Sequence, residues 1–181
     1  MNYYTADPHF FHERILEFCD RPFTSISEMN GRILAHYQAA VGPDDDLWII
    51  GDVAMVRSDM ADQLAMMLQS IPGRKHLVVG NHDKPWIRAL PVWESVHDMV
   101  EIIDDGTRLT LCHYPMITWP GARRGALQLF GHVHQNWQGS RNAVNVGVDV
   151  WEFKPVTIRE IRKRATGMPV NPLWSKVEPR S

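Results

Sequence analysis

The sequence predicts an α/β fold whose strands are parallel in the first half and form hairpins in the second. Three short apolar segments in the first half, 2–6, 47–50 and 76–79, have the length and composition of buried strands, and each is followed by a polar loop. Between them lie segments whose apolar residues recur at helical intervals. This alternation of strands and helices is typical of a parallel sheet covered by helices.

Two helices of the first half are indicated by their amino-terminal signals. Ser25 and Glu28 have the spacing of a capping box ahead of the amphipathic segment 29–41. Ser58 is expected to cap a second helix over 59–71, where apolar residues again follow the helical period. The first half therefore contains at least two helices that can cover a sheet.

The second half is predicted to begin with a hairpin. The strand-like segments 96–103 and 107–113 flank a turn sequence that ends in Gly106. Two further segments, 126–130 and 142–148, have the composition of strands. The pattern therefore changes from a helix-covered parallel sheet to a more antiparallel arrangement.

Length and composition indicate a single domain. With 181 residues, of which 44% are hydrophobic and 22% are charged, the chain is suited to one sizeable core. We expect this domain to span residues 1–165 and to end in a short helix capped by Thr157 and Glu160. The segment 166–181 contains three prolines and is expected to be an irregular tail.

Charge and cysteine content exclude several classes of partner. The chain has 19 basic and 21 acidic residues, so its formal net charge of −2 provides no field to attract long duplex nucleic acid or an anionic membrane. No segment approaches the roughly 20 apolar residues that cross a bilayer, and the N-terminus lacks signal-peptide features. Cys19 and Cys112 are far apart in the sequence, so a disulfide framework is not expected. The absence of such a framework fits a reducing compartment. We expect a cytoplasmic protein with a small-molecule partner, and the sequence leaves its oligomeric state open.

Chemically reactive side chains follow the predicted strands. They are Asp7 and His9 after the first strand, Asp52 after the second, Asn81, His82 and Asp83 after the third, and His113, His132 and His134 after two strands of the second half. Loops at the carboxyl ends of parallel strands gather at one edge of a sheet, where open α/β folds bind ligands. We therefore expect these loops to deliver their side chains to one place.

The residue types indicate a site for two divalent ions. Imidazole mixed with carboxylate and amide oxygen suits Mn²⁺, Fe²⁺, Co²⁺ or Zn²⁺, whereas calcium and magnesium sites use oxygen ligands. A catalytic zinc ion keeps about three protein ligands, and the strand-end residues could supply more than twice as many. Two ions that share a carboxylate account for the excess. Ions about 3.5–4 Å apart can hold a hydroxide between them and clamp a phosphoryl group during in-line displacement.

Five motifs occur in an order that resembles the calcineurin-like metallophosphoesterases, in particular small bacterial and phage members. The motifs are D-P-H at 7–9, G-D at 51–52, G-N-H-D at 80–83, His113, and G-H-V-H at 131–134, and the segment 145–156 resembles the closing segment of the small members. The resemblance covers roughly the first three quarters of the chain. It implies a four-layer αββα sandwich, with two mixed β-sheets packed face to face and helices outside.

The resemblance also implies a role for each matching residue. One ion would be held by Asp7, His9 and His134, the other by Asn81, His113 and His132, and Asp52 would bridge both, with Mn²⁺ as the favoured metal. His82 would be the general acid that protonates the leaving alkoxide, a task for a group that titrates near neutrality. Asp83 is expected to orient His82 by a hydrogen bond and to keep it protonated.

Asn81 and His12 are candidates for contact with the substrate. Similar proteins often carry a histidine at the position of His12 that can reach the substrate phosphate. A histidine that caps the following helix is an equally physical alternative for this position.

Hydrolysis of small phosphodiesters is the predicted activity. Serine/threonine protein phosphatases of the same superfamily carry G-D-x-x-D-R-G, whereas residues 51–57 read G-D-V-A-M-V-R, which disfavours a phosphoprotein substrate. A phosphomonoesterase and a hydrolase of nucleotides or nucleic-acid ends remain alternatives. A non-catalytic scaffold of the same fold is least favoured, because no motif residue is missing.

Overall fold

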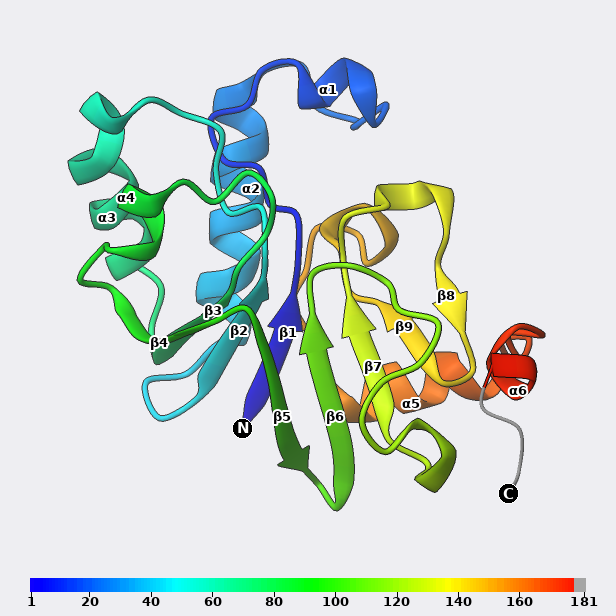
Figure 1. The fold of residues 1–181 in the computed structure, drawn as a ribbon. Coiled ribbons are helices and arrows are strands. Elements are labelled where there is room, and N and C mark those ends of the chain that lie inside the picture. Colours follow the sequence, from blue (N-terminus) through cyan, green and yellow to red (C-terminus); the bar gives the residue numbers. More distant parts are fainter. Residues whose placement is uncertain (178–181) are drawn as a thin grey trace.

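The structure, a computed structural model, describes residues 1–177 and contains two five-stranded mixed β-sheets flanked by helices (Figure 1). The first sheet has the order β10–β1–β2–β3–β4 and consists of β1 (Asn2–Thr5), β2 (Asp46–Ile50), β3 (Arg74–Val78), β4 (Trp93–His97) and β10 (Val156–Thr157). The second has the order β5–β6–β7–β9–β8 and consists of β5 (Met99–Asp104), β6 (Thr107–Cys112), β7 (Leu127–Phe130), β8 (Gly139–Ser140) and β9 (Ala143–Asn145). The α/β fold class predicted from the sequence is confirmed.

Strand direction brings the loops of the first sheet to a common edge. Strands β1 to β4 are parallel, and only β10 is antiparallel to its neighbour. In the second sheet β6, β7 and β9 are parallel, whereas β5 and β8 pair antiparallel. The loops that follow β1, β2 and β3 therefore meet at the carboxyl edge of the first sheet.

Strand β2 is apolar on both faces and contributes to both main clusters of the core. Leu47 and Ile49 belong to the cluster that packs under the helices, whereas Trp48 and Ile50 belong to the cluster shared with the second sheet. Successive side chains of a strand point to opposite faces, so a strand buried on both sides reads as a continuous apolar run. The second sheet contributes residues such as Leu111 to the shared cluster.

Helices cover the outer face of the first sheet (Figure 1). They are α2 (Ile26–Ala40), α3 (Ala61–Gln69) and α4 (Pro85–Arg88), with the one-turn helix α1 (Ile15–Phe18) beside them. The predicted cap of α2 is confirmed, since the Ser25 hydroxyl accepts a hydrogen bond from the Glu28 amide at 3.1 Å. The predicted cap of α3 is wrong: Ser58 begins the 3₁₀ turn η1 (Ser58–Met60), and α3 starts at Ala61 without a side-chain cap.

The second sheet is covered by two unlike elements. Helix α5 (Ile158–Thr166) contacts β1, β9 and β10 and adds apolar residues to the core between the sheets. Its predicted cap is present, because the Glu160 carboxylate accepts from the amide and hydroxyl of Thr157. The outer face of β7 and β9 is covered by the loop that contains the 3₁₀ turn η2 (Ala122–Arg124).

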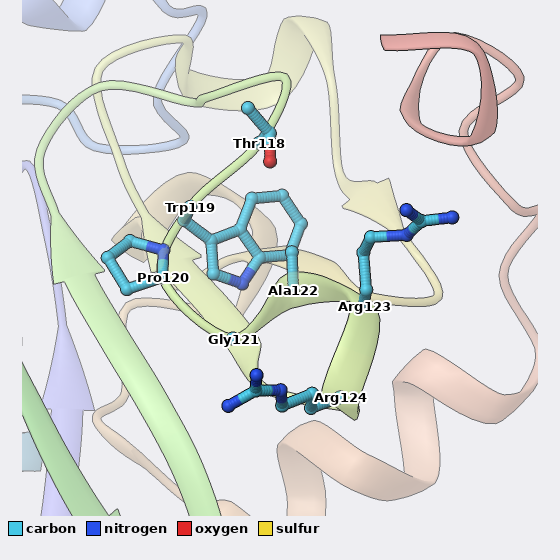
Figure 2. A pocket seen from close by; sticks show the side chains of 7 residues that line it. All are labelled: Thr118, Trp119, Pro120, Gly121, Ala122, Arg123 and Arg124. Carbon is cyan, nitrogen blue, oxygen red and sulfur yellow. The ribbon is translucent and has the colours of Figure 1, made fainter. Parts of the chain in front are cut away.

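That covering loop is anchored by Trp119. Its indole donates a hydrogen bond to the carbonyl of Ala126 at 3.0 Å, and its ring packs in a cluster with Phe130. Residues 118–124 line a cavity of about 500 Å³, in which the side chains of Arg123 and Arg124 point in opposite directions (Figure 2). None of the predicted site residues lines this cavity.

The hairpin of the second half is confirmed, but its first strand is divided. Residues 96–103 were predicted as one strand, whereas β4 ends at His97 in the first sheet and β5 begins at Met99 in the second. The chain thus passes from one sheet to the other at Asp98. Both strands alternate between exposed and half-buried residues, and the alternation shifts by one residue at the crossing, where Asp98 and Met99 are both exposed.

The segment predicted to be an irregular tail contains the one-turn helix α6 (Trp174–Val177). Residues 178–181 of that predicted tail lie outside the described part of the chain. Within residues 1–177, no helix combines the length and apolar character needed to cross a bilayer.

Candidate metal centre

The structure brings the predicted ligands together in two groups. Asp7, His9 and His134 form one group and Asp52, His113 and His132 the other, and within each group the candidate ligand atoms lie within 4.8 Å of one another. The residues come from the loops after β1, β2, β6 and β7, four segments far apart in the sequence. The expected convergence at strand ends is therefore found.

The backbone at these positions is held in an unusual conformation. Five of the seven predicted ligands have positive φ angles between 49° and 70°, namely Asp7, His9, Asp52, His132 and His134. Non-glycine residues rarely adopt this left-handed region, and such strain concentrates at functional sites. The fold therefore fixes the direction of these side chains at a cost in stability.

Two motif glycines permit the close approach of the loops. A Cβ atom on Gly80 would lie 2.4 Å from Oδ1 of Asp52, and one on Gly131 would lie 2.5 Å from Oδ2 of Asp7. Any side chain at either position would displace a carboxylate of the cluster. The glycines of G-N-H-D and G-H-V-H are thus explained by packing against the site.

His9 is the least satisfied polar group of the cluster. Its side chain is only 2% exposed, and neither ring nitrogen has a hydrogen-bond partner among residues 1–177. Burial lowers the pKa of His9 to about 2, so the ring is neutral and carries a free lone pair. A buried polar group without a partner is costly unless it binds an electron-pair acceptor. A divalent ion is such an acceptor.

Asp7 faces His9 from the same loop and is completely buried. Burial raises the pKa of Asp7 to about 6, and its carboxylate accepts hydrogen bonds from the His132 amide at 2.9 and 3.1 Å. A buried carboxylate with one backbone donor keeps unused lone pairs. Asp7 therefore has the capacity to bind a cation beside His9.

Three atoms that can bind a metal ion converge in the second group. The Nδ1–H of His113 donates to the Ile50 carbonyl at 2.9 Å, which leaves Nε2 facing Oδ1 of Asn81 at 3.1 Å and Oδ2 of Asp52 at 3.4 Å. Burial opposes charge on His113, but the hydrogen bond and charge of Asp52 raise its pKa to about 9. The carboxylates thus favour positive charge at this position, which a proton or a metal ion can supply.

Asp52 lies between the two groups. Its Oδ2 is 3.6 Å from Nε2 of His9 and 3.4 Å from Nε2 of His113. Burial opposes its charge, but the hydrogen bond from His113 lowers its pKa to about 2, so it is ionised at neutral pH. One carboxylate therefore faces both groups. Imidazole, carboxylate and amide donors in this arrangement fit borderline divalent metal ions.

The hydrogen bond predicted between Asp83 and His82 is not formed within residues 1–177. Within the described chain the Asp83 carboxylate accepts only backbone N–H groups, from Gly80 at 2.8 Å, Asp52 at 3.0 Å and Val53 at 2.9 Å. Its side chain points into the protein and is almost fully buried. Asp83 joins the loops after β2 and β3 and so positions the backbone that carries Asp52.

His82 and His12 lie at the open side of the cluster. The His82 side chain is 33% exposed, and its Nε2 is 4.0 Å from Oδ2 of Asp52. The ring of His12 lies 5.3 Å from that of His9, and its buried Nδ1 has no hydrogen-bond partner within residues 1–177. Both imidazoles therefore border the cluster, and the His82 ring is accessible to solvent.

Asp149 and Arg21 are site residues that the sequence did not reveal. Oδ2 of Asp149 accepts from Nδ1 of His134 at 2.8 Å, so Nε2 is the ring nitrogen left for a proton or a metal ion. Burial opposes charge on His134, but the hydrogen bond to Asp149 raises its pKa to about 10. The buried guanidinium of Arg21 binds both oxygens of Asp149, at 2.7 and 3.0 Å, and donates to the Asp7 and Pro8 carbonyls. This buried pair connects two loops of the first group.

Sequence signals for this pair were weak. Asp149 lies in the segment that resembles the closing segment of small metallophosphoesterases, but nothing there indicates its partner. Arg21 precedes Asp149 by 128 residues, and no local pattern links them. Cys19 also lies near His134 and Asp149, although these two are already bonded to each other.

Tyr114 is a further residue of the site that the sequence did not reveal. It follows His113, its side chain is 46% exposed, and its ring centroid is 4.6 Å from that of His132. The phenol therefore forms part of the accessible wall beside the second group.

Replacement of Asp149 should weaken metal binding selectively. The Asp149→Asn variant is expected to lose about 10- to 100-fold in affinity for a divalent ion such as Mn²⁺ at the first group, because His134 loses the carboxylate that fixes its tautomer. Metal titration by calorimetry checks this result. Asp59→Asn, which changes a surface aspartate in η1, is the matched control. Unchanged metal affinity in Asp149→Asn would contradict the assigned role.

The chain is similar in sequence to proteins whose names assign no activity. It is 27% identical over 169 residues to the uncharacterized protein MJ1445 of Methanocaldococcus jannaschii, with 89% of each protein covered. It is 24% identical over 180 residues to the gene 66 protein of Mycobacterium phage L5, covering 82% of this chain and 86% of the phage protein. No protein-family model matches the chain.

Among solved structures, the AQ665 protein of unknown function from Aquifex aeolicus matches with a TM-score of 0.74 and 28% identity, covering 91% of this chain and 98% of that protein. Two further structures have TM-scores of 0.47: YfcE, a phosphoesterase from E. coli (16% identity, 81% and 77% covered), and an archaeal phosphodiesterase (13% identity, 81% of each covered). The similarity to the Aquifex protein shows a shared fold over nearly the whole domain.

Proposed function

We propose that this chain is a phosphoesterase that requires two divalent ions, with Mn²⁺ favoured, and hydrolyses small phosphodiesters. The observation that carries the proposal is the buried imidazole of His9 between Asp7, Asp52 and His134, which has no hydrogen-bond partner among residues 1–177. A purely structural histidine would have a hydrogen-bond partner. The surrounding carboxylates and imidazoles are the ligand types of a hydrolytic metal centre.

Seven side chains would hold the ions. Asp7, His9 and His134 would bind one, Asn81, His113 and His132 the other, and Asp52 would contact both. When bound, such ions supply a nucleophile by lowering the pKa of water and neutralise charge on the phosphoryl group. The strained loops and the Asp83 and Asp149 contacts hold these ligands in place before substrate arrives.

His82 would supply the proton to the leaving alkoxide. It is the half-exposed imidazole next to Asp52, and its amide is tied to Oδ1 of Asp52 at 2.8 Å, which fixes the start of its side chain. An imidazole suits proton donation at neutral pH. His12 and Asn81 would contact the substrate from the first and second groups, respectively.

Removal of metal tests the proposal directly. Chelation should abolish hydrolysis of bis(p-nitrophenyl) phosphate, and Mn²⁺ or Co²⁺ should restore it, because the proposed mechanism takes its nucleophile and its charge neutralisation from the ions. The release of p-nitrophenolate is the measurement. Full activity in protein shown by elemental analysis to be free of metal would end the proposal.

Small diesters should be better substrates than matching monoesters. We expect a higher kcat/KM for the diester of each pair, since the site pairs an alkoxide-protonating histidine with a chain of net charge −2 that does not attract dianions. Activity should depend weakly on salt between about 50 and 200 mM, the range over which duplex binders lose most affinity. A strong monoester preference favours a phosphatase instead, and efficient duplex cleavage with a steep salt slope favours a nuclease.

A further inference from the structure

A groove of about 420 Å³ opens beside the candidate metal centre. It is lined by Phe11, His12, Glu13, Arg14, Ile26, Met55, Val56 and Met60. Its volume lies within the range of about 300–1,000 Å³ that is typical of small-molecule sites. His12 belongs to both regions, because it lines the groove and its ring is 5.3 Å from that of His9.

The walls of the groove are direct continuations of the ligand loops. Backbone hydrogen bonds pair His9 with Asp52 at 3.1 Å, and then Met55 with Phe10 at 3.1 Å. The segment after His9 and the segment after Asp52 therefore leave the cluster side by side. A ligand anchored at the cluster by its phosphate would have its remaining part next to this groove.

The lining combines apolar side chains with two exposed charged ones. Met55 is 41% exposed although it is a large apolar residue, and Met60 and Val56 lie near it in the lining. Thioethers make favourable contacts with aromatic rings. Glu13 and Arg14 are exposed and offer an acceptor and donors, the groups that recognise the polar edge of a nucleobase.

We infer that this groove binds the base of a nucleoside phosphodiester substrate. A nucleobase has apolar faces and polar edges, which match the methionine side chains and the two charged side chains of the lining. An aliphatic chain would leave Glu13 and Arg14 without a counterpart. This inference rests on the proposed phosphoesterase function and names the substrate class of the same site.

Equilibrium binding to the Mn²⁺-loaded protein tests the inference. Calorimetry should give a dissociation constant for adenosine 5′-monophosphate at least about tenfold lower than that for methyl phosphate. The binding free energy gained by contact with one base is sufficient for this ratio of dissociation constants. In the double variant Met55→Ala, Met60→Ala the ratio should fall below about threefold. Met66→Ala, an exposed methionine on α3 outside the groove, is the matched control and should keep the ratio.

Two results would overturn the inference. They are a ratio below about threefold in the wild-type protein, and a full ratio in the double variant. Failure of the proposed function is visible separately, because a Mn²⁺-loaded wild-type protein that does not hydrolyse bis(p-nitrophenyl) phosphate is not a phosphoesterase, whichever nucleotide it binds.

Discussion

The Asp52→Asn variant should lose more activity than any other single ligand replacement. Asp52 is the carboxylate that faces both His9 and His113, at 3.6 and 3.4 Å, so the amide would weaken both candidate metal sites together. The loss of metal affinity should exceed the 10- to 100-fold typical of residues that only support a ligand. Metal content after dialysis and the rate of bis(p-nitrophenyl) phosphate hydrolysis are the measurements.

The control for this replacement is again Asp59→Asn, which makes the same chemical change on the surface. Because asparagine has the shape of aspartate, the far-ultraviolet circular dichroism of Asp52→Asn should match that of the wild-type protein. A folded Asp52→Asn protein that retains two ions and full activity would show that Asp52 does not bridge the groups.

The His82→Ala variant should keep its metal but lose the proton donor. We expect a loss of about 10²–10⁴-fold in kcat for diesters with alkyl leaving groups, the usual range for general acid catalysis. For p-nitrophenolate, which leaves without a proton, the loss should be smaller. The comparison of the two substrates therefore separates proton donation from other roles of His82.

His97→Ala is the matched control for His82→Ala, since His97 lies on β4 and bonds to Ser95 outside the cluster. It should leave both rates unchanged. Equal losses on both substrates in His82→Ala, or loss of bound metal, would assign His82 a role other than general acid.

Much of the fold could be predicted because its signals are local. The strand β2 was visible as an apolar run and the helix α2 as an amphipathic segment with Ser25 as its cap, both properties of neighbouring residues. The division between β4 and β5 could not be predicted, because nothing at Asp98 indicates that one strand continues into a different sheet. The choice of sheet is a long-range property.

The same distinction applies to the site. The convergence of Asp7, Asp52 and His113 followed from their positions at strand ends, which the sequence marks clearly. The partners of Asp83 and Asp149 could not be inferred, because they are backbone amides and a guanidinium brought close only by the folded loops. The residues that position the ligands could therefore be identified only from the structure.

A crystal structure of the Mn²⁺-loaded protein, measured with anomalous scattering from manganese, tests the central claim most directly. The proposal predicts two anomalous peaks, one among Asp7, His9 and His134 and one among Asn81, His113 and His132, with Asp52 between them. A single peak, or manganese bound only beside Cys19 and Asp149, would contradict the two-ion centre.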